Sequence, residues 1–205
     1  MGAIQEKILI VKLKGRDTDS FAKLYDLYVE KIYRFVYFKV SSVEEAEDIT
    51  SETFLKAWNY LGKDDTEIRN LSSFLYQIAR NLVIDFYRQR SLKETVSVDN
   101  EKYGLHELPD KNQNVIAHVS KNLASEQIQN YLARLKDEYK EVVILKHLEG
   151  YSTKEISDIL GKKKGNVRVL LHRAIKAMSE IATEETKVTL LAQQKRQEKL
   201  NSPNA

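Results

Sequence analysis

Residues 161–176 combine many positive side chains with an absence of acids. This stretch holds three lysines in succession, then two arginines and a further lysine, with no aspartate or glutamate. Lysine neutralises phosphate, and the planar fork of arginine fits the O6 and N7 atoms of guanine. The composition favours contact with nucleic acid, and the alternative is a basic helix that only faces solvent. The basic residues are Lys162, Lys163, Lys164, Arg168, Arg173 and Lys176.

A second stretch, residues 76–93, mixes aromatic rings with an amide and four basic residues against a single acid. Aromatic rings stack on unpaired bases, arginine holds phosphate, and the amide of Asn81 can hydrogen-bond to a base edge. Several apolar residues there recur at helical spacing and belong to a core instead. Core packing does not account for Arg80 beside Asn81, or for the pair Arg88 and Arg90.

A third stretch, residues 44–56, carries a net charge of −4 opposite an apolar stripe. Such a face repels DNA, so it requires either solvent or a basic protein surface. Acids near a helix start also complement the helix dipole, which explains Glu44 and Glu45 well and Glu52 less well. The pattern leaves a protein contact and a solvated helix start equally open.

The residue types that would support an enzyme or a metalloprotein are missing. The chain has no cysteine, which excludes disulfides, thiolate ligands and a cysteine nucleophile. Its four histidines show no metal-ligand spacing, and its carboxylates form no set typical of an enzyme acting on DNA. We therefore expect no catalytic residue, no metal and no cofactor.

The chain also lacks the apolar runs that membranes require. No run approaches the ~20 residues of a membrane helix, and charges interrupt residues 1–13, where a secretory signal would be apolar. The net charge of +3 implies no partner by itself. We expect a cytoplasmic protein without a membrane contact.

Helices must position these three stretches, because glycine and proline are scarce and apolar residues recur every three or four positions. The N-terminal half predicts helices over 20–40, 43–61 and 71–90, with a polar loop over 62–70. The fold class we expect is all-α.

The composition then changes, which predicts two small helical domains joined by a flexible linker. Apolar residues become sparse over 91–122. Helical periodicity returns over 123–148 and ends at Gly150. The domains we expect are 1–92 and 123–182, with a linker over 93–122 and a tail over 183–205 that forms at most a weak helix.

The C-terminal domain has the pattern of a helix-turn-helix. Residues 152–155, Ser-Thr-Lys-Glu, form a capping box that starts a short helix ending at Leu160. Gly161 turns the chain into a longer helix over 164–181, which can enter the DNA major groove. We expect Arg168, Val169, His172 and Arg173 to face outward, opposite a buried side of Ile156, Ile159, Leu160, Val167, Leu170, Leu171 and Ala174.

Together these motifs resemble the extracytoplasmic-function sigma factors of the sigma-70 family. Residues 21–25, 46–58 and 74–88 (FAKLY, AEDITSETFLKAW and FLYQIARNLVIDFYR) resemble their N-terminal domain. Residues 149–156 and 165–174 (EGYSTKEI and GNVRVLLHRA) resemble their C-terminal domain. Two separate motifs in the right order make the resemblance specific over about residues 20–180.

The resemblance implies a non-enzymatic subunit with two kinds of partner, core RNA polymerase and promoter DNA; an anti-sigma factor is a further candidate partner. The 43–61 helix would bind the clamp helices of the largest polymerase subunit through Asp48, Ser51 and Glu52, and the polymerase flap is a further implied contact. The 71–90 helix would read and help to melt the −10 element, through Tyr76, Arg80, Asn81, Tyr87 and Arg88. The helix-turn-helix would read the −35 element, through Lys146, Lys163, Lys164, Arg168, Val169, His172 and Arg173.

Four residues of this chain depart from the family pattern. Ser51, Phe74, Lys136 and Ser157 stand where glutamine, tryptophan, proline and alanine are common in the family.

The alternative function is a stand-alone helix-turn-helix regulator, which would bind duplex DNA without polymerase. It would need an input domain, and the N-terminal half offers no phosphoacceptor pocket or ligand motif. An enzyme acting on DNA lacks its catalytic groups.

Overall fold

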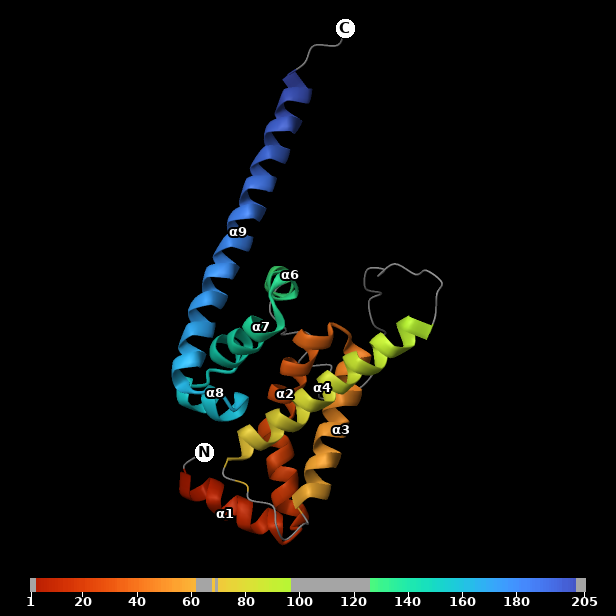
Figure 1. Ribbon diagram of the computed structural model, residues 1–205, viewed down its shortest axis with the longest axis vertical. Coiled ribbons are helices and arrows are strands. Elements are labelled where there is room, and N and C mark those ends of the chain that lie inside the picture. The colour runs from red at the N-terminus through yellow and green to blue at the C-terminus, as the bar shows by residue number, and fades with distance from the viewer. Residues whose placement is uncertain (1–2, 62–67, 69, 97–125, 202–205) are drawn as a thin grey trace.

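The computed structural model describes residues 3–61, 68, 70–96 and 126–201. Every element in this part of the chain is a helix, which confirms the all-α class (Figure 1). No helix among these residues is both long and apolar enough to cross a membrane. The predicted linker lies largely outside the described residues. The elements are α1 (Ala3–Lys14), α2 (Thr18–Val40), α3 (Val43–Leu61), α4 (Leu71–Val96), α6 (Glu126–Arg134), α7 (Asp137–Val143), η1 (Ile144–Leu148), α8 (Thr153–Leu160) and α9 (Lys164–Asn201).

Helices α2, α3 and α4 form an N-terminal bundle, as their apolar stripes predict. The carboxylate of Asp17 caps α2 by accepting a hydrogen bond from the Ser20 amide at 3.0 Å. Ser41 ends α2 in the left-handed conformation, with φ of 58°. The chain then re-enters a helix at Val43, so α2 and α3 lie against each other with their apolar sides facing.

Helix α1 was not predicted from the sequence. Leu9, Ile10 and Leu13 are buried against the bundle, while Ile4, Ile8 and Val11 on the opposite side are exposed. Because both sides of the helix are apolar, the sequence shows no amphipathic stripe there. The Glu6 carboxylate accepts a hydrogen bond from the amide of Leu71 at 2.9 Å and so joins α1 to the start of α4.

The C-terminal domain departs from the predicted 123–148 helix. The chain breaks between α6 and α7, where Lys136 has φ of −57° and ψ of 144°, which is extended backbone. The helix then closes in the π-helical turn η1, and Gly150 follows with φ of 75°. Leu132, Leu135, Tyr139 and Val142 keep steps of three and four across the break, so the apolar pattern did not reveal it.

Helix α9 is longer than the sequence predicts. The predicted helix over 164–181 does not end there, because α9 continues to Asn201. The exposed Arg134 side chain of α6 pairs with Glu184 of α9 at 2.7 Å, which holds the middle of α9 against the domain. Beyond this pair α9 extends away from the other helices (Figure 1).

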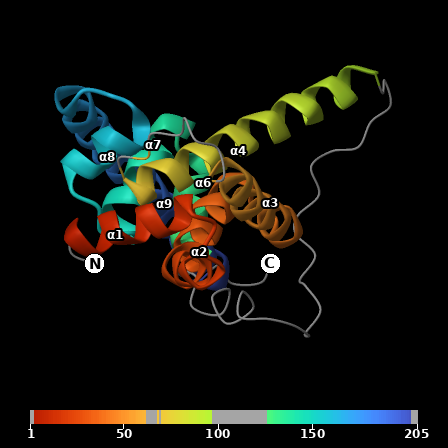
Figure 2. The same cartoon turned by 90° about the horizontal axis from the view of Figure 1, so that it is seen from below.

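The two domains lie against each other, with the N-terminal half of α4 beside α8. Seen from below, the other half of α4 projects from the body of the molecule (Figure 2). The same helix therefore offers one covered and one free part.

Candidate nucleic-acid and polymerase interfaces

The predicted recognition helix presents its basic side chains to solvent. Lys163, Lys164, Arg168, His172 and Arg173 are exposed, and Val169 retains 48% of its accessible surface. The opposite side of α9 packs into the core with Val167, Leu170 and Ala174, as predicted, while Leu171 is half-buried. This division leaves an acid-free basic surface that can approach a phosphate backbone.

The capping box that starts α8 is formed as predicted. The amide of Glu155 donates to the Ser152 hydroxyl at 3.3 Å, and the Ser152 amide donates to the Glu155 carboxylate at 2.8 Å. These hydrogen bonds lower the pKa of the Glu155 carboxyl below its ordinary value of 4.5. The reciprocal bonds fix the start of a helix that is only eight residues long.

The turn between α8 and α9 is held by a residue that departs from the family pattern. Gly161 adopts φ of 62°, a left-handed conformation that glycine reaches without strain. The Ser157 hydroxyl donates to the Lys162 carbonyl at 2.6 Å, and the Lys162 amide donates to the Ser157 carbonyl at 3.1 Å. An alanine at position 157 would lose the first of these bonds.

Lys146 lies apart from the α9 surface. It belongs to η1, is half-buried, and its Nζ atom lies 3.4 Å from the carbonyl oxygen of Tyr151. Its placement in the described structure is therefore beside the turn before α8.

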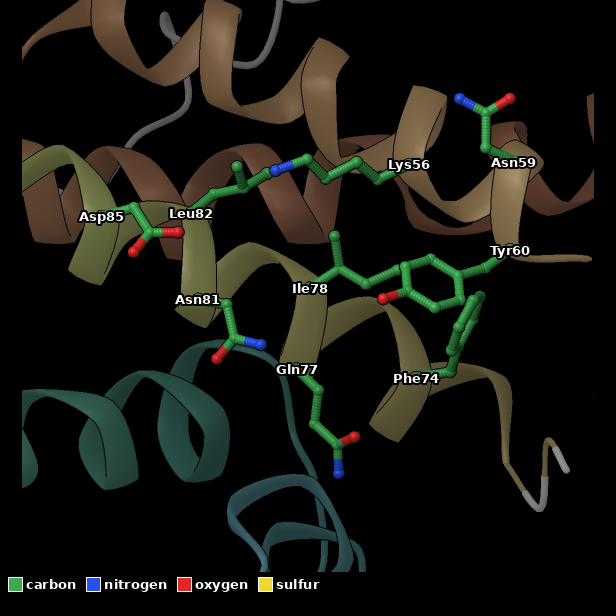
Figure 3. A pocket seen from close by; sticks show the side chains of 9 residues that line it. All are labelled: Lys56, Asn59, Tyr60, Phe74, Gln77, Ile78, Asn81, Leu82 and Asp85. Atoms are coloured by element: carbon green, nitrogen blue, oxygen red, sulfur yellow. The ribbon is translucent and has the colours of Figure 1, made fainter. Parts of the chain in front are cut away.

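A groove between α3 and α4 has Asn81 among its lining residues (Figure 3). Its volume is about 560 Å³. The exposed ring of Tyr60 lies at one end, with its centroid 6.3 Å from that of Phe74 in an edge-to-face arrangement. Stacking surface, an amide and a lysine therefore lie within one opening. The lining residues are Lys56, Asn59, Tyr60, Phe74, Gln77, Ile78, Asn81, Leu82 and Asp85.

The α3 side of this groove was not predicted from the sequence. Lys56 is the last residue of the acidic stretch, and Asn59 and Tyr60 follow it on the same helix. The signal that points to them is Tyr60, an aromatic residue outside the apolar stripe of α3, which remains 48% exposed. An aromatic residue off the buried stripe is a candidate stacking surface.

The other predicted −10 residues do not share this groove. Tyr76 is completely buried, and burial raises the pKa of its hydroxyl well above the ordinary value of 10.0. Arg80 is half-buried and paired with a carboxylate of the C-terminal domain. Tyr87 donates its hydroxyl to the Lys39 carbonyl at 2.6 Å, while the exposed Arg88 lies 3.4 Å from Asp85 on its own helix.

Helix α3 shows an acidic outer face that also carries an exposed apolar residue. Asp48, Ser51 and Glu52 are all exposed. Leu55, about one turn further along the same side of the helix, retains 60% of its accessible area. The opposite stripe is buried as predicted, with Ala46, Ile49, Thr50, Thr53, Phe54, Ala57 and Leu61. This face therefore offers acidic and polar side chains together with one exposed leucine.

Comparison with protein families and curated proteins assigns both domains. Residues 24–92 match the model of sigma-70 region 2, and residues 125–178 match that of sigma-70 region 4. SigW, an ECF RNA polymerase sigma factor of Bacillus subtilis, is 37% identical over 177 residues, covering 82% of this chain and 92% of SigW. BldN, an ECF sigma factor of Streptomyces coelicolor, is 28% identical over 179 residues, covering 87% of this chain and 66% of BldN.

Two solved structures share the fold. The chain aligns with CnrH in complex with the cytosolic domain of CnrY at a TM-score of 0.64 and 20% identity, covering 89% of this chain and 99% of CnrH. It aligns with the sigma factor RpoE in complex with the anti-sigma factor NepR from Bartonella quintana at a TM-score of 0.60 and 23% identity, covering 80% and 96%. With the SigW identity spanning both domains, the chain belongs to the extracytoplasmic-function sigma factors, which direct RNA polymerase to promoters.

Proposed function

We propose that this sigma factor reads a promoter with two separate surfaces. The domain spanning residues 123–182 reads the duplex −35 element through α9, and the domain spanning residues 1–92 reads the unpaired −10 element through the groove at Asn81. The observation that carries the proposal is the exposed basic side of α9, which has no acid over residues 161–176 and lies opposite a side that packs into the core. Arginine on such a face can fork onto guanine in the major groove.

The groove between α3 and α4 suits a base that has left the stack. Tyr60 offers a ring face, Asn81 offers a donor and an acceptor, and Lys56 at the rim offers a positive charge for phosphate. The Lys56 ammonium lies 3.0 Å from the Glu52 carboxylate on the next turn. DNA would therefore exchange that partner for a phosphate.

The outer face of α3 is the proposed polymerase contact. Asp48, Ser51 and Glu52 supply polar and acidic groups that form part of its rim, and Leu55, about one turn further along, supplies apolar area. Such a rim steers association with a basic partner and contributes more to the association rate than to affinity.

We also propose where the protein acts and how it is controlled. The protein acts in the cytoplasm, where polymerase and DNA are found, and it contributes no catalytic step of its own. Control by an anti-sigma factor is supported by the two structural neighbours, each of which was solved in complex with a second protein, named as an anti-sigma factor in the case of NepR.

Transcription from single-base promoter variants tests the division of labour. Core polymerase is supplied with the wild-type chain, with Asn81→Ala or with Arg173→Ala, and melting is followed by permanganate footprinting. Asn81→Ala should blunt discrimination at one −10 base and slow opening, while Arg173→Ala should alter preference in the −35 element. If both variants shift preference at the same promoter position, the proposed division is wrong. Binding of duplex promoter DNA with equal specificity in the absence of polymerase would favour a stand-alone regulator.

A further inference from the structure

The two domains meet through charges that are sorted by domain. Among the described residues, the ion pairs that join the domains take their bases from α2 and α4 and their acids from α7 and the residue after η1. Arg34 forks onto Glu149 with bonds of 2.8 and 2.9 Å. The Lys39 ammonium donates to Asp137 and Glu141, at 2.7 Å in each case.

Several of these charged groups are buried in the closed structure. The Glu149 side chain has no accessible surface, and those of Glu141 and Lys39 retain 6% and 3%. A buried charge is costly without a partner, so each of these groups depends on its counterpart in the other domain. When the domains separate, the same groups return to water. The contact is therefore charge-matched and opens without leaving an unpaired charge in a core.

The contact also covers part of the DNA-reading helix. Arg80 donates to both carboxylate oxygens of Glu141, at 3.0 and 3.2 Å. The Tyr76 ring lies edge-to-face against Tyr151 of the C-terminal domain, with centroids 5.6 Å apart. A carboxylate that accepts two parallel bonds from arginine has the geometry of a bound phosphate. Glu141 therefore occupies the position that a DNA phosphate would take on Arg80.

The closed arrangement is incompatible with reading both promoter elements at once. The elements are named for positions roughly 25 base pairs apart, which is about 85 Å along B-form DNA at 3.4 Å per step. In the structure α4 and α8 are in contact. The chain between α4 and α6 has about 30 residues and reaches about 100 Å when fully extended, which is long enough to span both elements.

We propose that Glu141 and Glu149 form an autoinhibitory latch that keeps the free sigma factor closed, with Glu141 standing in for a DNA phosphate on Arg80. The latch rests on the proposed function in one respect, namely that α4 contacts −10 DNA. Opening the latch exposes Arg80 and Tyr76 together and frees α9 to move to the −35 element.

Domain separation can be measured by energy transfer between two dyes. The chain has no cysteine, so Ala22→Cys on α2 and Ser179→Cys on α9, both at exposed positions, accept labels without further changes. Arg34→Glu or Glu149→Arg should each raise the open-to-closed ratio by at least about tenfold, because a broken buried pair leaves a charge without its partner. The double variant Arg34→Glu/Glu149→Arg should restore transfer, since it rebuilds the pair with reversed charges.

The matched control is Glu184→Gln, which removes the exposed pair with Arg134 inside the C-terminal domain and should leave transfer unchanged. Circular dichroism confirms that each variant is folded. If both single reversals leave transfer at the wild-type value, or if the double reversal fails to recover it, the latch does not exist.

Binding of single-stranded DNA to the free chain tests whether Glu141 masks Arg80. The free chain is titrated with a fluorescent single strand that carries a −10 sequence selected with core polymerase. Glu141→Gln should strengthen binding several-fold, and adding Arg80→Gln should cancel the gain. If the domains open but Glu141→Gln does not strengthen DNA binding, Glu141 does not stand in for a phosphate on Arg80. If Asn81→Ala changes no −10 preference with polymerase, the proposed −10 site fails, while the energy-transfer result still decides the latch.

Discussion

The outer face of α3 gives the sharpest prediction about polymerase binding. The change is the double reversal Asp48→Lys/Glu52→Lys, which alters the formal net charge of the chain from +3 to +7. If a basic polymerase surface faces α3, two attractive contacts become repulsive. We expect the affinity for core polymerase to fall by about 1.4 kcal/mol or more, which is at least about tenfold in Kd.

The structure predicts a much smaller effect on folding. Glu52 and Lys56 form an i,i+4 pair at 3.0 Å with side chains 49% and 44% exposed, and such pairs contribute only ~0.3–0.5 kcal/mol. A lysine at position 52 also places two like charges one turn apart, which costs a similar amount. The total loss of folding free energy should therefore stay near ~1 kcal/mol, against the ~5–15 kcal/mol typical of a folded domain.

Titration of labelled chain with core polymerase measures the affinity, and thermal unfolding measures the stability. The matched control is Glu180→Lys on α9, which breaks the exposed i,i+4 pair with Lys176 and reverses one charge. The loss of affinity should shrink as salt rises, since exposed charges are screened. An unchanged Kd for the double variant, or an equal loss for Glu180→Lys, would refute an acidic polymerase contact on α3.

Three further predictions concern the helix-turn-helix. Arg173→Ala should cost ~1–3 kcal/mol on the preferred −35 sequence and relax specificity at one base pair, while Lys163→Ala should weaken all sequences alike and lower the salt slope by about one; holoenzyme binding to variant promoters at several salt concentrations checks both. Ser152→Ala should destabilise the protein by ~1 kcal/mol through loss of the cap, as chemical denaturation would show. Because the folded-state pKa of Glu155 lies below 4.5, its contribution is present above that pH and is lost as the pH falls through the lowered pKa. Glu155→Gln should therefore destabilise at pH 7, and its difference from wild type in thermal unfolding should shrink as the pH falls below 4.5.

The sequence predicted helices whose packing is local and continuous. The bounds of α3, Val43–Leu61, agree with the prediction because its apolar stripe is unbroken from end to end. The capping box and the Gly161 turn were predictable for the same reason, since each is decided by residues within five positions. Helix α1 could not be predicted in this way, because its two sides are both apolar and only the contact with the bundle decides which is buried.

The sequence prediction ended α9 at Ile181 because apolar residues become sparse after it. Past Ile181 the chain loses apolar residues but keeps good helix formers, and no glycine or proline follows until Pro203. The hydroxyls of Thr183 and Thr186 bond to carbonyls one turn earlier, at 2.8 and 2.9 Å, so even these residues are accommodated. Intrinsic helix propensity therefore continues the helix where burial alone would end it.

The predicted −10 residues show most clearly what a single sequence leaves out. At about 100° per residue, Tyr76, Arg80 and Tyr87 fall on one face of α4, and Asn81 and Arg88 fall on the next. At Tyr76 and Arg80 the first face is covered by Tyr151 and Glu141 of the other domain, while Tyr87 stays 42% exposed. The second face opens onto the groove or solvent.

Both faces carry residue types suited to single-stranded DNA, so composition could not separate them. Only the contact between domains, between residues some 60 positions apart in the case of Arg80 and Glu141, distinguishes the face that is free from the face that is closed. A −10 strand that used Asn81 alone would leave the closed structure intact. A strand that also used Arg80 would have to displace Glu141, and promoter reading would then be coupled to the opening of the two domains.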